Sequence, residues 1–178
     1  MKFLKLILIV GLLTTLGFTK TKENLTFEFK DNKNTTYHVK STEAGMDIKE
    51  LRGQVVFLAL FGHRCPPCMM EISGFREFTN DAKYNKRAKI LALEVQGLNS
   101  DNIEDFISSS NINYSVVAGS SYLDFINYIG YRTKWNNLIP FMVVLDTTGK
   151  VVDFGNGIVS QDELRDLTDK LSPIKEKK

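Results

Sequence analysis

The amino-acid sequence predicts an α/β protein with three layers, in which a central β-sheet of mixed strand direction lies between helices. Three observations lead to this fold class. A continuously apolar strand candidate, residues 54–60, runs into Cys65-Pro-Pro-Cys68 and then into a run with helical spacing of apolar residues. Further strand candidates alternate with helical segments, which favours parallel neighbours, and a hairpin near the end adds antiparallel strands.

Residues 1–19 resemble a secretory signal peptide, so we expect the folded domain to comprise residues 20–178. Two lysines precede a nearly continuous apolar run, residues 6–13, and a plausible cut follows Gly17. This run is short for a membrane span, which needs about 20 residues. The cleavage site is not of the strong A-x-A type, so an uncleaved membrane anchor stays open. A lipid anchor on an N-terminal cysteine is excluded, because no cysteine lies there.

Charge and location follow from this segment. The full chain has 23 basic and 21 acidic residues, and residues 1–17 hold Lys2 and Lys5 but no acid, so the remainder is balanced at 21 of each. Nothing indicates nucleic acid, and the basic end at residues 175–178 reads as a solvated tail. Export would place the domain in the periplasm or on the outer face of the cytoplasmic membrane, where conditions are oxidising.

The N-terminal part contains two short strand candidates, residues 25–29 and 35–39, joined by a polar turn at 31–34. Asp47-x-x-Glu50 looks like a capping box that opens one helical turn and stops at Gly53.

The middle of the chain supplies the predicted sheet. Val55–Leu60 is apolar throughout, as expected of a central strand covered on both faces, and the helix after it should run from the cysteines to about Lys83. The next predicted elements are a strand at 89–95, a helix from Ser100 to about Ser110, a strand at 114–118 and a helix from Ser121 to Ile129.

The C-terminal part closes the sheet. Phe141–Leu145 is a strand candidate, Asp146–Lys150 a hairpin turn, and residues 151–154 its return strand. Ser160-x-x-Glu163 is a capping box for a last helix that ends before Pro173.

Cys65 and Cys68 are the only cysteines in the chain and the predicted centre of its chemistry. Cys65 would lie at the N-terminus of a helix, whose partial positive charge and free N–H groups favour a thiolate. Such sites lower the pKa of a cysteine from about 8.5 to roughly 3.5–7.5, and the nearby Arg64 and His63 could add to this. Cys65 is then the exposed attacking thiolate, and Cys68 the buried resolving thiol.

Other uses of the pair are weaker. A zinc site needs four ligands, and two cysteines with His38 and His63 do not make a convincing set. A purely structural disulfide remains open, although a two-residue loop constrains little of the unfolded chain. A copper(I) carrier is a remote option, since soft thiolates suit that ion.

With these features the sequence resembles the thioredoxin superfamily, and within it the exported thiol–disulfide oxidoreductases of the TlpA/ResA/CcmG type. The resemblance covers roughly residues 25–172. It is carried by the apolar strand leading into Cys65-Pro-Pro-Cys68, by Glu71, by Ile139-Pro140 and by the turn at 146–150.

The resemblance implies a thioredoxin fold with an added N-terminal β-hairpin, and a cis Pro140 beside the disulfide. The backbone of Ile139 could then offer strand-like hydrogen bonds to an extended substrate. The alternative is that Pro140 merely begins a strand.

Two further side chains are site candidates. Glu71 lies three residues after Cys68, on the same helix face, and in the family a glutamate here tunes the cysteines. A partly buried carboxylate could carry protons and raise thiol pKa values, whereas an exposed one would only stabilise the helix dipole. Trp135 and Tyr131 could line the substrate groove, although such residues more often belong to the core.

Three departures from the family pattern concern the active-site surface. Arg64 replaces the usual tryptophan before the first cysteine, Ser73 replaces a frequent proline, and residues 131–138 replace a shorter approach to the proline. These changes leave the substrate open.

The sequence therefore predicts a thiol–disulfide oxidoreductase acting outside the cytoplasm, without a cofactor beyond the Cys65–Cys68 disulfide. The resemblance implies that this monomer reduces disulfides of target proteins, with cytochrome c maturation as one pathway, and that a membrane thiol reductant recharges it. A disulfide-forming oxidant and a non-catalytic partner-binding module are the alternatives.

Overall fold

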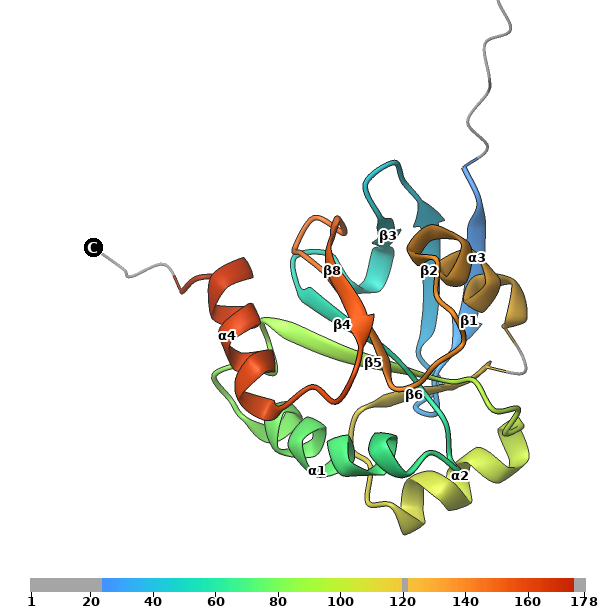
Figure 1. The fold of residues 1–178 in the computed structure, drawn as a ribbon. Coiled ribbons are helices and arrows are strands. Elements are labelled where there is room, and N and C mark those ends of the chain that lie inside the picture. Colours follow the sequence, from blue (N-terminus) through green and yellow to red (C-terminus); the bar gives the residue numbers. More distant parts are fainter. Residues whose placement is uncertain (1–23, 120–121, 175–178) are drawn as a thin grey trace, which may run out of the picture.

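The computed structural model describes residues 24–119 and 122–174 (Figure 1). At its centre is a five-stranded sheet in the order β6-β5-β4-β7-β8. Its strands are β4 (Val55–Phe61), β5 (Ala88–Glu94), β6 (Ser115–Ala118), β7 (Phe141–Leu145) and β8 (Val151–Asn156). β4, β5 and β6 are mutually parallel, whereas β7 runs antiparallel to β4, and β8 runs antiparallel to β7. The predicted mixed sheet is thus confirmed.

One face of the sheet is covered by three helices, α1 (Pro66–Asn80), α2 (Ser100–Ser109) and α4 (Gln161–Leu171) (Figure 1). Side chains of β4 alternate between two cores, one on each face of the sheet, and every residue of the strand is therefore buried. Val55, Phe57 and Ala59 point into the core beneath these helices, together with Phe75 and Phe78 of α1.

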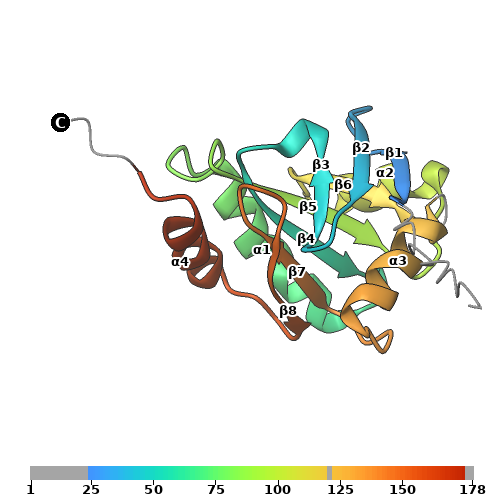
Figure 2. The same cartoon turned by 90° about the horizontal axis from the view of Figure 1, so that it is seen from above.

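The other face is covered by α3 (Leu123–Thr133) and by a small N-terminal sheet (Figure 2). That sheet contains β1 (Thr26–Lys30), β2 (Thr36–Ser41) and β3 (Met46–Ile48), all antiparallel. The added hairpin is therefore present but carries a third strand. The second layer consequently combines a helix with a sheet, and both bury apolar side chains against β4, β5 and β7.

The third strand makes the capping box predicted at Asp47 and Glu50 wrong. Asp47 lies in β3, where its carboxylate accepts hydrogen bonds from Arg52, and Glu50 accepts one from the backbone N–H of His38. The helical turn itself exists as a short 3₁₀ helix, η1 (Lys49–Leu51), without a side-chain cap. Pairing with β2 offered the backbone more hydrogen bonds than a single helical turn could.

Several predicted helix ends differ from the structure. α1 ends at Asn80, and α3 starts at Leu123 but continues to Thr133, four residues beyond its predicted end. The cap of α2 is Asn99, whose side chain accepts from the N–H of Asn102. The predicted capping box at the start of α4 is confirmed: the Ser160 side chain accepts from the N–H of Glu163, and the Glu163 side chain accepts from the N–H of Ser160.

The N-terminal segment predicted at residues 1–19 lies outside the described residues. Across residues 24–119 and 122–174, no helix is both long and apolar enough to cross a membrane.

Candidate active site

Cys65 and Cys68 form a disulfide at the start of α1. Cys65 is the N-cap of the helix, and its sulfur accepts a hydrogen bond from the backbone N–H of Cys68 at 3.3 Å. Pro66 and Pro67 fill the first helical positions, where a missing N–H costs nothing. The N–H of Cys68, which now donates to the Cys65 sulfur, would stabilise its thiolate after reduction.

Both cysteines are buried in the disulfide form. Cys65 is 5% exposed and Cys68 is 2% exposed, and both belong to the core beneath α1. The expected contrast between an exposed Cys65 and a buried Cys68 is therefore not found in this oxidised state. The two residues differ instead in their surroundings, because Cys65 is the cap of α1 whereas Cys68 lies inside it.

The Ile139–Pro140 peptide bond is cis, as the resemblance implied. The carbonyl oxygen of Ile139 lies 3.9 Å from the Cys65 sulfur. This proximity follows from the sheet, since β7 pairs with β4 so that Leu60 lies opposite Phe141. The preceding carbonyl, of Leu138, is held by Asn156 Nδ2 at 2.6 Å, and Gly157 donates to the carbonyl of Pro140 at 3.1 Å.

Glu71 is buried on α1, with only 5% of its surface exposed. Its Oε1 accepts a hydrogen bond of 2.8 Å from the backbone N–H of Val159, in the loop before α4. Burial raises the pKa of Glu71 from 4.5 to about 7, and the Val159 hydrogen bond offsets this only in part. The expected alternative of an exposed glutamate at the helix dipole is wrong, and the carboxyl can exchange a proton near neutral pH.

Trp135 and Tyr131 have different surroundings. Trp135 is half-buried against the second core, with its ring centroid 5.9 Å from that of Phe141. Its indole N–H donates to the carbonyl of Leu138 at 2.7 Å, which ties it to the segment before Pro140. Tyr131 is 85% exposed on α3 and does not share this position.

A His63–Glu94 pair beside the cysteines was not identified from the sequence. The Nδ1 of His63 lies 2.9 Å from Oε1 of Glu94, and the side chain of Glu94 is fully buried at the end of β5. The sequence signal that pointed to a special role for Glu94 was its place at the end of a largely apolar strand. The partner could not be inferred, because 31 residues separate the two.

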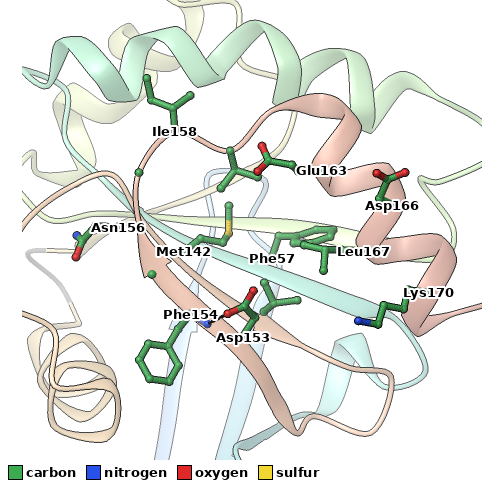
Figure 3. A pocket seen from close by; sticks show the side chains of 14 residues that line it. Phe57, Met142, Asp153, Phe154, Asn156, Ile158, Glu163, Asp166, Leu167 and Lys170 are labelled. Atoms are coloured by element: carbon green, nitrogen blue, oxygen red, sulfur yellow. Dashed lines mark hydrogen bonds between the residues drawn. The ribbon is translucent and has the colours of Figure 1, made fainter.

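A cavity of about 420 Å³ lies beside the site rather than on the disulfide (Figure 3). It opens between β8 and α4, over an apolar floor that includes Phe57, Met142 and Leu167. Val159 lines it as well, so the cavity wall includes the residue that hydrogen-bonds Glu71. Among the described residues, no group of three or more His, Cys, Asp or Glu is arranged to hold a metal ion.

Comparisons with known proteins agree with this architecture. Residues 26–154 match the AhpC/TSA family. No curated protein sequence matches the chain. Solved structures that are similar include StoA from Bacillus subtilis, which is 18% identical with a TM-score of 0.62 over 82% of this chain and 97% of that chain. A putative DsbE from Chlorobium tepidum is 15% identical, with a TM-score of 0.59 over 84% and 93%.

A secreted disulfide oxidoreductase from Mycobacterium tuberculosis, homologous to E. coli DsbE, is 20% identical, with a TM-score of 0.58 over 82% of this chain and 96% of that chain. At these identities the solved structures establish the fold, and the match to the family covers more than half of the sequence. The chain therefore belongs to the AhpC/TSA family, and it has the thioredoxin-like fold and the Cys-x-x-Cys pair of a thiol–disulfide oxidoreductase.

Proposed function

We propose that this protein reduces disulfide bonds of target proteins outside the cytoplasm, with Cys65 as nucleophile and Cys68 as resolving thiol. The observation that carries the proposal is the position of the pair. The Cys65 sulfur receives an N–H from the start of α1 on one side and lies 3.9 Å from the Ile139 carbonyl on the other. A thiolate is thus stabilised beside a backbone segment to which an extended substrate can bind.

The exchange proceeds in two displacements. The thiolate of reduced Cys65 attacks one sulfur of the target disulfide, forms a mixed disulfide and expels the other target sulfur as a thiolate, which takes up a proton. The thiolate of Cys68 then attacks the Cys65 sulfur and expels the second target thiolate, which is also protonated. The target has gained two electrons and two protons, and the pair ends as the disulfide seen here.

Glu71 is proposed to move protons in the second displacement. Cys68 must lose its proton before it can attack, and it is buried on the same helix, three residues before Glu71. With a pKa of about 7, the Glu71 carboxyl can accept a proton and return it near neutral pH.

The substrate is proposed to bind over the backbone of Ile139 and Pro140, with Trp135 supporting this segment through Leu138. Three large apolar side chains on neighbouring segments are strongly exposed: Met70, Leu138 and Ile158. Large apolar side chains that are exposed on the segments around a reactive site favour a protein partner over a small polar substrate.

The location and partners belong to the same proposal. Residues 1–19 would direct or tether the chain to the periplasm or the outer face of the cytoplasmic membrane, where a membrane thiol reductant would regenerate the dithiol. Cytochrome c maturation is the proposed pathway, because the active-site motif resembles that of the TlpA/ResA/CcmG type.

The redox equilibrium of the Cys65–Cys68 pair with glutathione tests the direction of electron flow. A reductant should have a potential near that of thioredoxin, about −270 mV, whereas a potential near the −120 mV of DsbA would make the protein a disulfide-forming oxidant. Reduction of insulin by the dithiol form tests activity. If insulin is not reduced and a Cys65→Ser/Cys68→Ser variant still binds its partner, the protein is a binding module and not an enzyme.

A further inference from the structure

The residues just before Cys65 are held by a buried carboxylate at the end of β5. Glu94 has no exposed surface, and its side chain accepts four hydrogen bonds. Oε1 accepts from His63 through its backbone N–H and Nδ1, and from the N–H of Gln96, whereas Oε2 accepts from the N–H of Leu98. A buried carboxylate is tolerated when donors satisfy it in this way. Because Glu94 has no exposed surface, its carboxylate cannot contact a docking partner.

A second contact fixes the residue next to the nucleophile. Oε1 of Gln96 accepts the backbone N–H of Arg64 at 2.8 Å. The two segments approach so closely that a Cβ on Gly62 would clash with the side chain of Gln96. The backbone of Arg64 is therefore fixed, while its side chain is exposed. Within the part of the chain that the structure describes, the Arg64 guanidinium has no carboxylate partner.

The strand register brings four fully described loops to this end of the sheet, where β6 also ends, at Ala118 beside Glu94. Phe61 pairs with Glu94, and Phe141 lies opposite both Leu60 and Asn156, so the segments 62–65, 95–99, 134–140 and 157–160 share one edge. We call these four segments the active-site edge.

The charged and imidazole side chains of the active-site edge are His63, Arg64 and Lys134, and none of its residues is acidic. The first turn of α1 has no acid either, and Glu71 is buried. Acidic residues lie in the first turns of two helices that follow the edge, Asp101 on α2 and Asp162 and Glu163 on α4. Within the segments of the active-site edge itself the charges are therefore basic, although the chain as a whole is nearly neutral.

We propose that the active-site edge selects target proteins whose disulfide is flanked by acidic side chains, with Arg64 as the main specificity residue. The inference rests on the proposed thiol–disulfide exchange and adds the chemistry of the substrate. Arg64 precedes the nucleophile directly, so its guanidinium faces residues next to the target cysteine in the mixed disulfide. Complementary charges at the rim of an interface mainly raise the rate of association, and added salt weakens the effect.

Three disulfide-bonded peptides test this. They differ only in the residues flanking the disulfide, which are glutamate, glutamine or lysine, and the dithiol form of the protein reduces each one. Each rate constant is divided by that of dithiothreitol with the same peptide, because flanking charges also change the intrinsic reactivity of a disulfide. At low ionic strength the corrected rate should be about fivefold higher for the glutamate peptide than for the lysine peptide, and the ratio should shrink in 0.5 M salt.

Variants then locate the effect. Arg64→Ala should lower the glutamate-to-lysine ratio to near one, and Arg64→Lys should retain most of it. Lys86→Ala is the matched control, an exposed cation just before β5 at the opposite end of the sheet, and it should leave the ratio unchanged. Equal corrected rates in the wild type, or an unchanged ratio in Arg64→Ala, would overturn the inference while exchange itself stands. Reduction of none of the peptides would overturn the proposed function instead.

Discussion

The carboxylate of Glu71 on α1 accepts a hydrogen bond of 2.8 Å from the backbone N–H of Val159, 88 residues further along the chain. This bond joins the helix that carries the cysteines to the loop that enters α4. Burial of the carboxylate nevertheless outweighs the bond, so its pKa rises to about 7. A group that changes charge near neutral pH therefore lies one helical turn from the disulfide.

The first prediction concerns stability and pH. Because the folded-state pKa of Glu71, about 7, exceeds its ordinary value of 4.5, the folded state binds the proton more tightly. The stabilising contribution is complete below pH 4.5 and is lost as the pH rises through 7, up to about 3 kcal/mol in total. Glu71→Gln should remove this decline, as measured by denaturant unfolding of the oxidised protein at pH 5 and pH 8. Glu104→Gln, an exposed site on α2, should preserve it, and a decline of equal size in Glu71→Gln would contradict the assignment.

The second prediction concerns the thiolate. An ionised Glu71 disfavours a further negative charge on the nearby sulfurs, and glutamine removes this repulsion while keeping the shape. In the reduced protein, Glu71→Gln should shift the pH dependence of Cys65 alkylation to lower pH by roughly 0.5–1 unit. The sulfurs and the carboxyl titrate together, so the observed midpoint belongs to the group. Coincident alkylation curves for wild type and variant would reduce Glu71 to a structural residue.

The third prediction assigns the two sulfurs. Cys68→Ser should accumulate mixed disulfides with target proteins through Cys65, because Cys65 at the helix cap forms the stabilised thiolate and no resolving thiol remains. Electrophoresis without reducing agent measures the amount of mixed disulfide, and mass spectrometry of the trapped species identifies the cysteine that formed it. Cys65→Ser is the paired control and should trap little. Trapping by Cys65→Ser instead would reverse the two roles.

The fourth prediction separates Trp135 from Tyr131. Trp135→Phe keeps an aromatic ring against Phe141 but loses the hydrogen bond to the Leu138 carbonyl. We expect a loss of about 1 kcal/mol in unfolding free energy, and severalfold slower exchange with disulfide peptides, with unchanged alkylation of Cys65. Circular dichroism follows the unfolding, since Trp135 is the only tryptophan. Tyr131→Phe, at an exposed position, should change neither quantity, and slower alkylation in Trp135→Phe would indicate a wider disturbance.

Local patterns predicted much of the fold correctly. The apolar run of β4 and the helical spacing after the cysteines depend on burial and on chain periodicity, which neighbouring residues express directly. Cys65 at the helix cap and the Ser160 capping box were predicted for the same reason, because each depends on residues within one helical turn. The third N-terminal strand was missed, since β3 gains its hydrogen bonds from β2 and not from its own sequence.

The sequence by itself determined the class of fold, the redox pair and its place at a helix N-terminus, because these follow from short-range pattern and composition. Only the tertiary structure decided what surrounds the pair. Three contacts around the pair join residues at least 31 positions apart: Glu71 with Val159, Ile139 with Cys65, and Glu94 with His63. The burial of Glu71 likewise depends on how distant elements pack over it. Strand order, strand register and the packing of α4 beside α1 determine these contacts. They cannot be predicted from the local sequence around each residue.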